Sequence, residues 1–191
     1  MARWEGGAQE RLQQAALGLF AERGFEGATV AEIAAAAGLT ERTFFRYYAD
    51  KREVLFRDQG AFEQAFVTGL RGAPGGTGPM AMIAAALEAG AVSHPQERRP
   101  WSRTRQEVVS AHGAFQEREL LKLSALADTL TGALAERGVD PTTAALAAQS
   151  GVTVYRAAFA AWIADGEERP FAEVQREILG KLHALLGTPP A

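Results

Sequence analysis

Two arginines four residues apart, Arg42 and Arg46, are the side chains whose type and spacing point most directly to chemistry. On a helix, residues four apart share one face, so both guanidinium groups would project together. In the DNA major groove an arginine can form two hydrogen bonds with guanine, and it also binds phosphate. The two positions therefore predict base reading, with phosphate contact and a plain solvated charge as the alternatives.

The neighbours of the two arginines fit the same surface. Thr43 can contact a thymine methyl group or a phosphate. Glu41 would accept a hydrogen bond from cytosine but repel phosphate, and we interpret it first as a favourable charge near a helix N-terminus. Residues 42–57 hold five cations and two acids, a local charge of +3, whereas the whole chain carries −3. A basic tip on an acidic chain favours site-specific DNA binding over binding by bulk charge.

No catalytic or metal-binding pattern appears elsewhere in the sequence. There is no cysteine, and His94, His112 and His183 stand far apart without metal-ligand spacing. Nucleophile-elbow and phosphate-loop patterns are also missing. We therefore expect no catalytic residue, no metal and no cofactor. The first residues have neither a signal peptide nor a long apolar run, which predicts a cytoplasmic protein without a membrane span.

Two short helices must position the arginines. Thr29 and Glu32 have capping-box spacing, so the first short helix should begin after Thr29. Gly38 permits the positive φ of a tight turn, and Thr40 can cap the second short helix. Phe44 on that helix, with Tyr48 four residues later, should point into the core. This is the pattern of a helix-turn-helix.

Helical periodicity runs through almost the whole chain, and no segment alternates for long enough to be a strand. We expect a first helix over 9–23 that buries Leu12, Ala16, Leu19 and Phe20, and a long helix over 51–71. The glycine-rich run 72–78 is the one clear linker. Beyond it we expect helices over 79–91, 98–111, 115–137, 141–164 and 170–186. The fold class is therefore all-α, with about nine helices.

The stretch from Arg11 to Leu55 resembles the tetracycline-repressor (TetR) family of transcriptional regulators. The resemblance rests on Phe20-Ala-Glu-Arg-Gly-Phe25, Thr29-Val-Ala-Glu-Ile33, Ala37-Gly-Leu39, Thr43-Phe-Phe-Arg-Tyr-Tyr48 and Lys51. It implies a DNA-binding domain over 1–52 and a helical ligand-binding and dimerisation domain over 53–191. It also implies a regulator, usually a repressor, that a small molecule releases from a palindromic operator.

The resemblance extends the DNA-contact set. It implies phosphate contacts from Tyr47 and Lys51, with Thr29 contributing from the preceding helix. Phe45 stands where this family more often has tyrosine, so a phosphate hydrogen bond is missing and we expect a packing role there. The DNA-binding set consists of Thr29, Thr40, Glu41, Arg42, Thr43, Phe45, Arg46, Tyr47 and Lys51.

The C-terminal part is similar to the acyl-CoA-like ligand-binding domain of some members of the family. Large side chains at helical spacing are usually core, yet a bundle interrupted by Pro100 and Gly113 can hold a ligand among them. The arginine-rich stretch 98–105 would suit an anionic group, unless it is a solvated basic face. The expected effector is small and hydrophobic, with acyl-CoA esters and fatty acids as candidates. The ligand-binding set consists of Phe66, Trp101, Arg105, Phe115, Tyr155, Phe159 and Trp162.

The last two helices are rich in alanine and glycine, including Gly151 and Ala158, which permits close helix approach, and part of this surface must be core within one chain. The resemblance implies a homodimer built through these helices, and a two-fold dimer places two DNA readers on one palindrome. Two rival classes stay open. One is a helical enzyme that modifies small molecules, and the other is a helical protein-interaction module that does not bind DNA.

Overall fold

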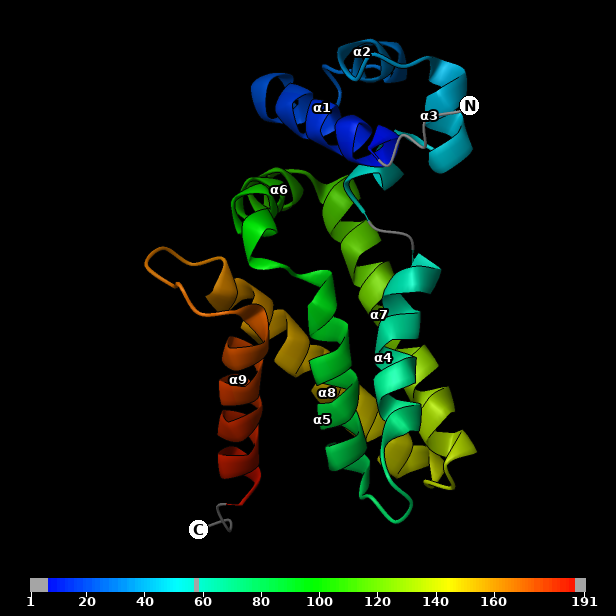
Figure 1. The fold of residues 1–191 in the computed structure, drawn as a ribbon, viewed down its shortest axis with the longest axis vertical. Helices are drawn as coiled ribbons and strands as arrows, with labels where there is room; N and C mark the ends of the chain where they lie inside the picture. The colour runs from blue at the N-terminus through cyan, green and yellow to red at the C-terminus, as the bar shows by residue number, and fades with distance from the viewer. Residues whose placement is uncertain (1–6, 57–58, 188–191) are drawn as a thin grey trace. The chain divides into compact units, whose positions relative to one another are not determined.

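The computed structural model describes residues 7–56 and 59–187. Within these ranges the chain forms nine α-helices and three short 3-10 helices and no strand, which confirms the predicted all-α class (Figure 1). The α-helices are α1 Ala8–Arg23, α2 Val30–Ala36, α3 Glu41–Tyr47, α4 Gln59–Gly72, α5 Pro79–Gly90, α6 Arg99–Ala111, α7 Gly113–Glu136, α8 Pro141–Trp162 and α9 Phe171–Leu186. The 3-10 helices are η1 Lys51–Leu55, η2 Ala91–Ser93 and η3 Gln96–Arg98.

The described residues divide into two compact units. The first contains residues 7–56 together with Arg103–Glu119, and the second contains residues 59–102 and 120–187. The first unit is therefore discontinuous in sequence, because the end of α6 and the start of α7 belong to it. No described helix has both the length and the run of apolar residues needed to cross a membrane.

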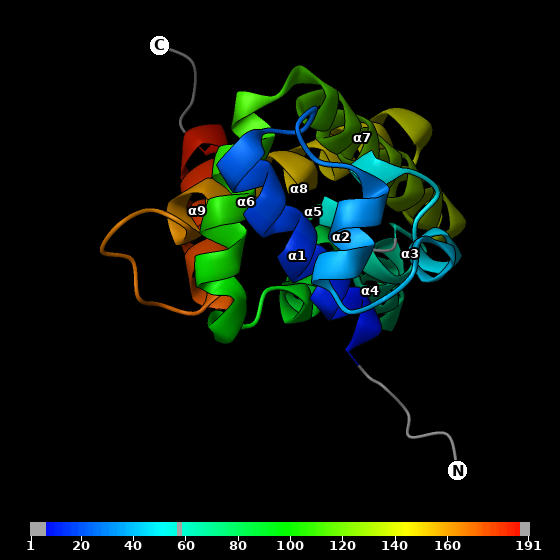
Figure 2. The ribbon, with the colours of Figure 1, turned by 90° about the horizontal axis from the view of Figure 1, so that it is seen from above.

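Local hydrogen bonds determine where the short helices of the first unit begin. Thr29 accepts a hydrogen bond from the Glu32 backbone N–H, and Glu32 accepts one from the Thr29 N–H, so the predicted capping box is confirmed. Gly38 has a φ of 67°, and the Thr40 side chain caps α3. Both turn predictions are therefore confirmed, and α2 and α3 meet at a steep angle (Figures 1 and 2).

Two predictions about the first 71 residues are wrong. On α1 the predicted burial of Leu12, Ala16 and Phe20 is confirmed, but Leu19 is only partly buried, and Gln13 and Leu17 are buried in addition. The long helix predicted over 51–71 is interrupted. The Asp50 carboxylate accepts hydrogen bonds from the Arg52 and Glu53 N–H groups and starts η1, and Phe56 is then extended. Residues 57–58 lie outside the described residues, and α4 begins at Gln59.

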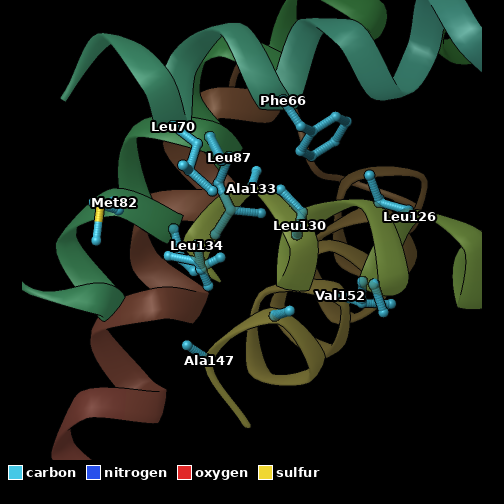
Figure 3. Packing of buried hydrophobic residues seen from close by; sticks show 14 of the residues in the cluster. Phe66, Leu70, Met82, Leu87, Leu126, Leu130, Ala133, Leu134, Ala147 and Val152 are labelled. Atoms are coloured by element: carbon cyan, nitrogen blue, oxygen red, sulfur yellow. The ribbon is translucent and has the colours of Figure 1, made fainter. Parts of the chain in front are cut away.

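The second unit packs its helices around an aliphatic core. Phe66 and Leu70 of α4, Ile83 and Leu87 of α5, and Leu130 of α7 are almost completely buried there. Figure 3 shows labelled side chains from α4, α5, α7 and α8 converging on this core. Helix α8 begins as predicted at Asp140-Pro141, where the Asp140 side chain accepts from the Thr143 N–H.

Two of the small residues expected at the dimer interface, Gly151 and Ala158, belong to the chain's own core. A Cβ on Gly151 would lie 2.8 Å from Cγ2 of Ile83, so α5 and α8 approach each other closely at this glycine. Ala158 is fully buried and packs with Trp162, Phe171 and Val174. The expectation that Gly151 and Ala158 form a surface between two chains is therefore wrong, because helices of the same chain cover them.

Candidate nucleic-acid interface

Helix α3 presents the predicted cationic face to solvent. Glu41, Arg42 and Arg46 are exposed and Thr43 is half-buried. Phe44 is completely buried and Tyr48 is 5% exposed, so both point into the core as predicted. The amphipathic pattern of seven residues thus leaves the two arginines at the centre of the open face, where they are available to a ligand.

Phe45 departs from its predicted packing role. Its side chain is 53% exposed, and its ring approaches that of Phe44 edge-on, with the ring centres 5.5 Å apart. The physical reason is helical geometry, because a residue directly after the buried Phe44 is turned about 100° away from the buried face. Phe45 therefore lies beside the arginines on the open surface of α3.

Arg46 is held in place by its neighbour. Its guanidinium donates to the Tyr47 hydroxyl at 3.0 Å and lies 4.9 Å from the centre of the same ring. A guanidinium has five N–H donors, so this contact leaves donors for a base or a phosphate. The predicted phosphate contact of Tyr47 stays a prediction, with its hydroxyl already shared with Arg46.

Lys51 has a second role that the sequence did not indicate. Its ammonium donates to the backbone carbonyls of Phe25 and Ala28 at 2.7 and 2.8 Å, and it lies 4.1 Å from the centre of the Phe25 ring. Lys51 therefore ties η1 to the connection between α1 and α2. An ammonium has three N–H donors, so one is left after the two carbonyl contacts. The phosphate contact of Lys51 stays a prediction for that remaining donor.

Two of the three threonines of the predicted set act first as helix caps, Thr29 on α2 and Thr40 on α3. Thr29 also donates its hydroxyl to Glu32 at 2.9 Å, and Thr40 and Thr43 pair their hydroxyls at 3.1 Å. The backbone N–H and hydroxyl of Thr29, together with Arg23, lower the pKa of the Glu32 carboxyl. The capping box thus holds Glu32 ionised, and α2 begins at a fixed residue.

An aromatic cluster completes the first unit. Phe115 of α7 is fully buried against Phe20, Phe25 and Phe56, with ring centres 5.5, 4.8 and 6.3 Å away. His112 accepts a hydrogen bond from the Phe25 backbone N–H at 3.2 Å. The segment 103–119 therefore packs directly behind the connection that leads into α2.

Charged groups bind the same segment to η1. Arg105 donates to the Leu55 carbonyl at 2.9 Å and pairs with Glu119 at 2.8 Å, and Arg118 pairs with Glu53. Arg105 and Phe115 were expected at a ligand site, and here they have partners within the first unit. Their ligand role stays a prediction.

The second unit contains an aromatic cluster around His94. Its ring lies 5.6 Å from Tyr155, 5.4 Å from Phe159, 5.8 Å from Trp162 and 4.5 Å from Phe171, measured between ring centres. His94 Nε2 and the Tyr155 hydroxyl share a hydrogen bond of 3.2 Å. Phe66 joins through Tyr155 at 5.8 Å. Four predicted ligand residues are thus brought together, and the ring of His94, which was not among the predicted ligand residues, contacts three of them.

Two buried polar groups lie on the helices of this cluster. Gln175 of α9 is 2% exposed and Trp162 is fully buried. Within the described part of the chain, neither the Gln175 amide nor the indole N–H of Trp162 has a hydrogen-bond partner. Gln175 was not singled out, because a lone glutamine on an amphipathic helix carries no sequence signal. Trp101 is the remaining residue of the predicted ligand-binding set. The Cζ atom of Arg98 lies 4.6 Å from the centre of its ring.

Comparison with known protein families matches two stretches of the chain. Residues 12–57 match the family described as bacterial regulatory proteins, tetR family. Residues 77–187, more than half of the chain, match the family described as the MftR C-terminal domain. The two matches leave only the chain ends and the 58–76 segment outside them.

Curated relatives match parts of the chain. The chain is 37% identical over 81 residues to the HTH-type transcriptional regulator TcmR of Streptomyces glaucescens, which is 42% of this chain and 36% of that protein. It is 45% identical over 47 residues, 25% of this chain and 24% of that protein, to a putative mycofactocin biosynthesis transcriptional regulator, MftR, of Mycobacterium tuberculosis. The matched regions thus span about a third or less of these relatives.

Solved structures share the fold over nearly the whole chain. FadR from Bacillus subtilis, a transcriptional regulator in complex with stearoyl-CoA, has a TM-score of 0.61 at 17% identity and covers 91% of this chain and 96% of its own. A SmeT–triclosan complex has a TM-score of 0.62 at 16% identity and covers 94% of this chain and 91% of its own. At such identities the likeness concerns the fold alone.

Proposed function

Because the chain belongs to the tetR family of bacterial regulatory proteins, we propose that it is a dimeric transcriptional repressor whose α3 helices read a palindromic operator. The observation that carries the proposal is the open face of α3, where Arg42 and Arg46 are exposed side by side and Tyr47 orients Arg46. A helix-turn-helix of this kind inserts its second helix into the major groove. The acidic chain as a whole then limits binding to DNA that α3 recognises.

Random-site selection with the full chain is the direct test of DNA binding. A palindromic consensus with salt-dependent affinity is the expected result, because several phosphate contacts release counterions. Recovery of no consensus, together with no mobility shift at low salt, would contradict the proposal. It would favour the interaction-module alternative instead.

Arg46→Ala should weaken binding to the selected operator by about 1–3 kcal/mol and relax preference at one base pair in each half-site. The reason is that a bidentate arginine–guanine contact discriminates between bases. Gel shifts on operator and random duplexes measure both effects. Arg52→Ala is the matched control, since Arg52 is a nearby exposed cation outside α3 and is paired with Asp50 at 2.9 Å. An equal loss on both duplexes for Arg46→Ala would make it a phosphate contact only.

We infer that the effector binds in the second unit, among Phe66, Tyr155, Phe159 and Trp162. The aromatic cluster around His94 supports an apolar ligand. The side-chain amide of Gln175 and the indole N–H of Trp162 are buried without a hydrogen-bond partner among the described residues, which supports a hydrogen-bonding group on that ligand. Stearoyl-CoA, bound by FadR, has a long hydrophobic acyl chain, and triclosan, bound by SmeT, is a hydrophobic aromatic molecule; both proteins share this fold. A ligand that favours one arrangement of the two readers would lower operator affinity by its difference in binding free energy.

Stearoyl-CoA is the first effector to test. If it binds only the native protein, a concentration about 100 times its dissociation constant adds about 2.7 kcal/mol of stability, and it should release the operator. Thermal unfolding and gel shifts measure the two effects. Phe159→Ala, at a half-buried position of the cluster, should reduce both effects while DNA binding without ligand is unchanged. Leu121→Ala, at a position 54% exposed on α7, is the control.

Two outcomes would change the effector assignment. If stearoyl-CoA and free stearate neither stabilise the protein nor release DNA, while triclosan does both, the acyl assignment is wrong and an aromatic effector is favoured. If Phe159→Ala and Leu121→Ala respond like the unchanged protein, the site is not among the aromatic residues of the second unit.

We propose that the dimer forms through exposed positions of α8 and α9. Leu146 and Leu185 are 66% and 74% exposed, and a Cβ on Gly180 would meet no atom within 4 Å. The proposed interface therefore stays on the two helices that the family resemblance implies. It uses these exposed positions, whereas Gly151 and Ala158 face the chain's own core. Burying such apolar surface between two copies would stabilise the dimer.

A further inference from the structure

Phe45 is the large apolar side chain that the recognition surface leaves in solvent. It is 53% exposed, compared with complete burial of Phe44 beside it. The edge-on contact with Phe44 at 5.5 Å, with ring planes at 80°, restricts the ring. A phenylalanine held at the surface in this way offers an apolar contact at a defined place on α3.

Phe45 lies next to the two arginines around the axis of α3. Successive residues of a helix are about 100° apart, so Phe45 flanks the face centred on Arg42 and Arg46, whereas Thr43 and Tyr47 flank it on the other side. The sequence order and the exposure of these side chains agree with this placement. Whatever the arginines contact, Phe45 therefore meets it from one edge.

The chemistry of the ring limits what it can recognise on DNA. Phenylalanine has no hydrogen-bond donor, so it cannot replace the phosphate contact that a tyrosine makes. The major-groove edges of the bases offer donors and acceptors, and the thymine 5-methyl is the apolar group that identifies a base there. A ring beside base-reading arginines is thus suited to a methyl group.

We propose that Phe45 is a specificity-determining residue that reads the 5-methyl group of one thymine in each operator half-site. The inference rests on the proposed DNA binding, and it adds a base preference that the arginines alone do not provide. The contact excludes water from a methyl group and from the edge of an aromatic ring. Removing the methyl group should therefore remove the contribution of this contact to operator affinity.

Deoxyuridine substitution isolates this contact, because deoxyuridine differs from thymidine only by the missing methyl group. Each thymine of the selected operator is replaced in turn, at symmetric positions in both half-sites, and the affinity of the full-length protein is measured. One symmetric pair should lower affinity roughly fourfold per half-site, the factor that corresponds to burial of one methyl group. Other thymines should show a smaller change.

Variants assign the methyl effect to its residue. In Phe45→Ala the affinity ratio between thymine and deoxyuridine operators at the sensitive position should fall to about one. In Tyr47→Ala, which removes the other exposed aromatic ring of α3, overall affinity should fall but the ratio should persist. Circular dichroism tests whether each variant is folded, and both should be, because the two side chains lie at the surface.

Three results would overturn the inference. In the first, no thymine of the operator shows methyl dependence with the unchanged protein. In the second, the dependence survives in Phe45→Ala. In the third, Phe45→Ala weakens operator and random DNA equally, which would place the ring against the sugar-phosphate backbone. None of these results contradicts DNA binding itself, which the site selection tests separately.

Discussion

Phe115→Ala is expected to destabilise the first unit by about 3–5 kcal/mol, the range for removal of a fully buried aromatic side chain. Phe115 lies on α7, far along the sequence from α3, yet its ring packs against Phe20, Phe25 and Phe56. Operator affinity should therefore fall although no DNA-contact residue is changed. Urea unfolding and gel shifts at the same temperature measure the two losses.

The control for this variant is Leu121→Ala on the same helix. Leu121 is 54% exposed, so its truncation should change stability by less than about 0.5 kcal/mol. If Phe115→Ala keeps the unfolding midpoint and operator affinity of the unchanged protein, the aromatic cluster does not support the reader. A loss of effector response with full stability would instead return Phe115 to the ligand site.

Gly180→Glu is expected to convert the protein into a monomer and to lower operator affinity roughly 100-fold or more, because two linked readers bind far more tightly than one. Gly180 lies on an open position of α9, where a Cβ would meet no atom outside its own stretch of helix within 4 Å. A glutamate there should leave the monomer folded while adding charge to the proposed contact between copies. Sedimentation measures the mass, and gel shifts measure the affinity.

Gly132→Glu provides a matched control. Gly132 is also an exposed helical glycine with no atom within 4 Å of a Cβ, but it lies on α7. Both substitutions remove a helix glycine, so both should slightly favour the helix. Dimer loss in both variants would indicate a general effect of charge, and a stable dimer in Gly180→Glu would place the interface elsewhere.

Most of the local structure follows from short-range rules in the sequence. The capping box at Thr29 and Glu32, the left-handed Gly38 and the Asp140-Pro141 start each depend on residues within one helical turn. Such signals are complete in the sequence, because the interacting atoms are neighbours along the chain. The order of nine α-helices in the described residues is predictable for the same reason.

The contacts that the sequence did not reveal join residues far apart in the chain. Lys51 binds the Phe25 and Ala28 carbonyls, and Gly151 admits the side chain of Ile83. Helical periodicity says that a residue faces inward or outward, but it does not say which distant element it meets. For that reason Gly151 resembled an interface residue, and Phe45 was assigned to packing although it is exposed.

The discontinuous first unit has a consequence for how the protein is made. During synthesis α1, α2 and α3 leave the ribosome well before Arg103–Glu119, the segment that supplies Phe115, His112 and Arg105 to the same unit. The aromatic rings of Phe20, Phe25 and Phe56 therefore cannot pack against Phe115 until that later residue has been translated. Contacts between such distant segments slow folding, since a long loop must close first. A nascent chain stopped before residue 103 should thus lack a mature DNA reader even though every residue of α3 has already been made.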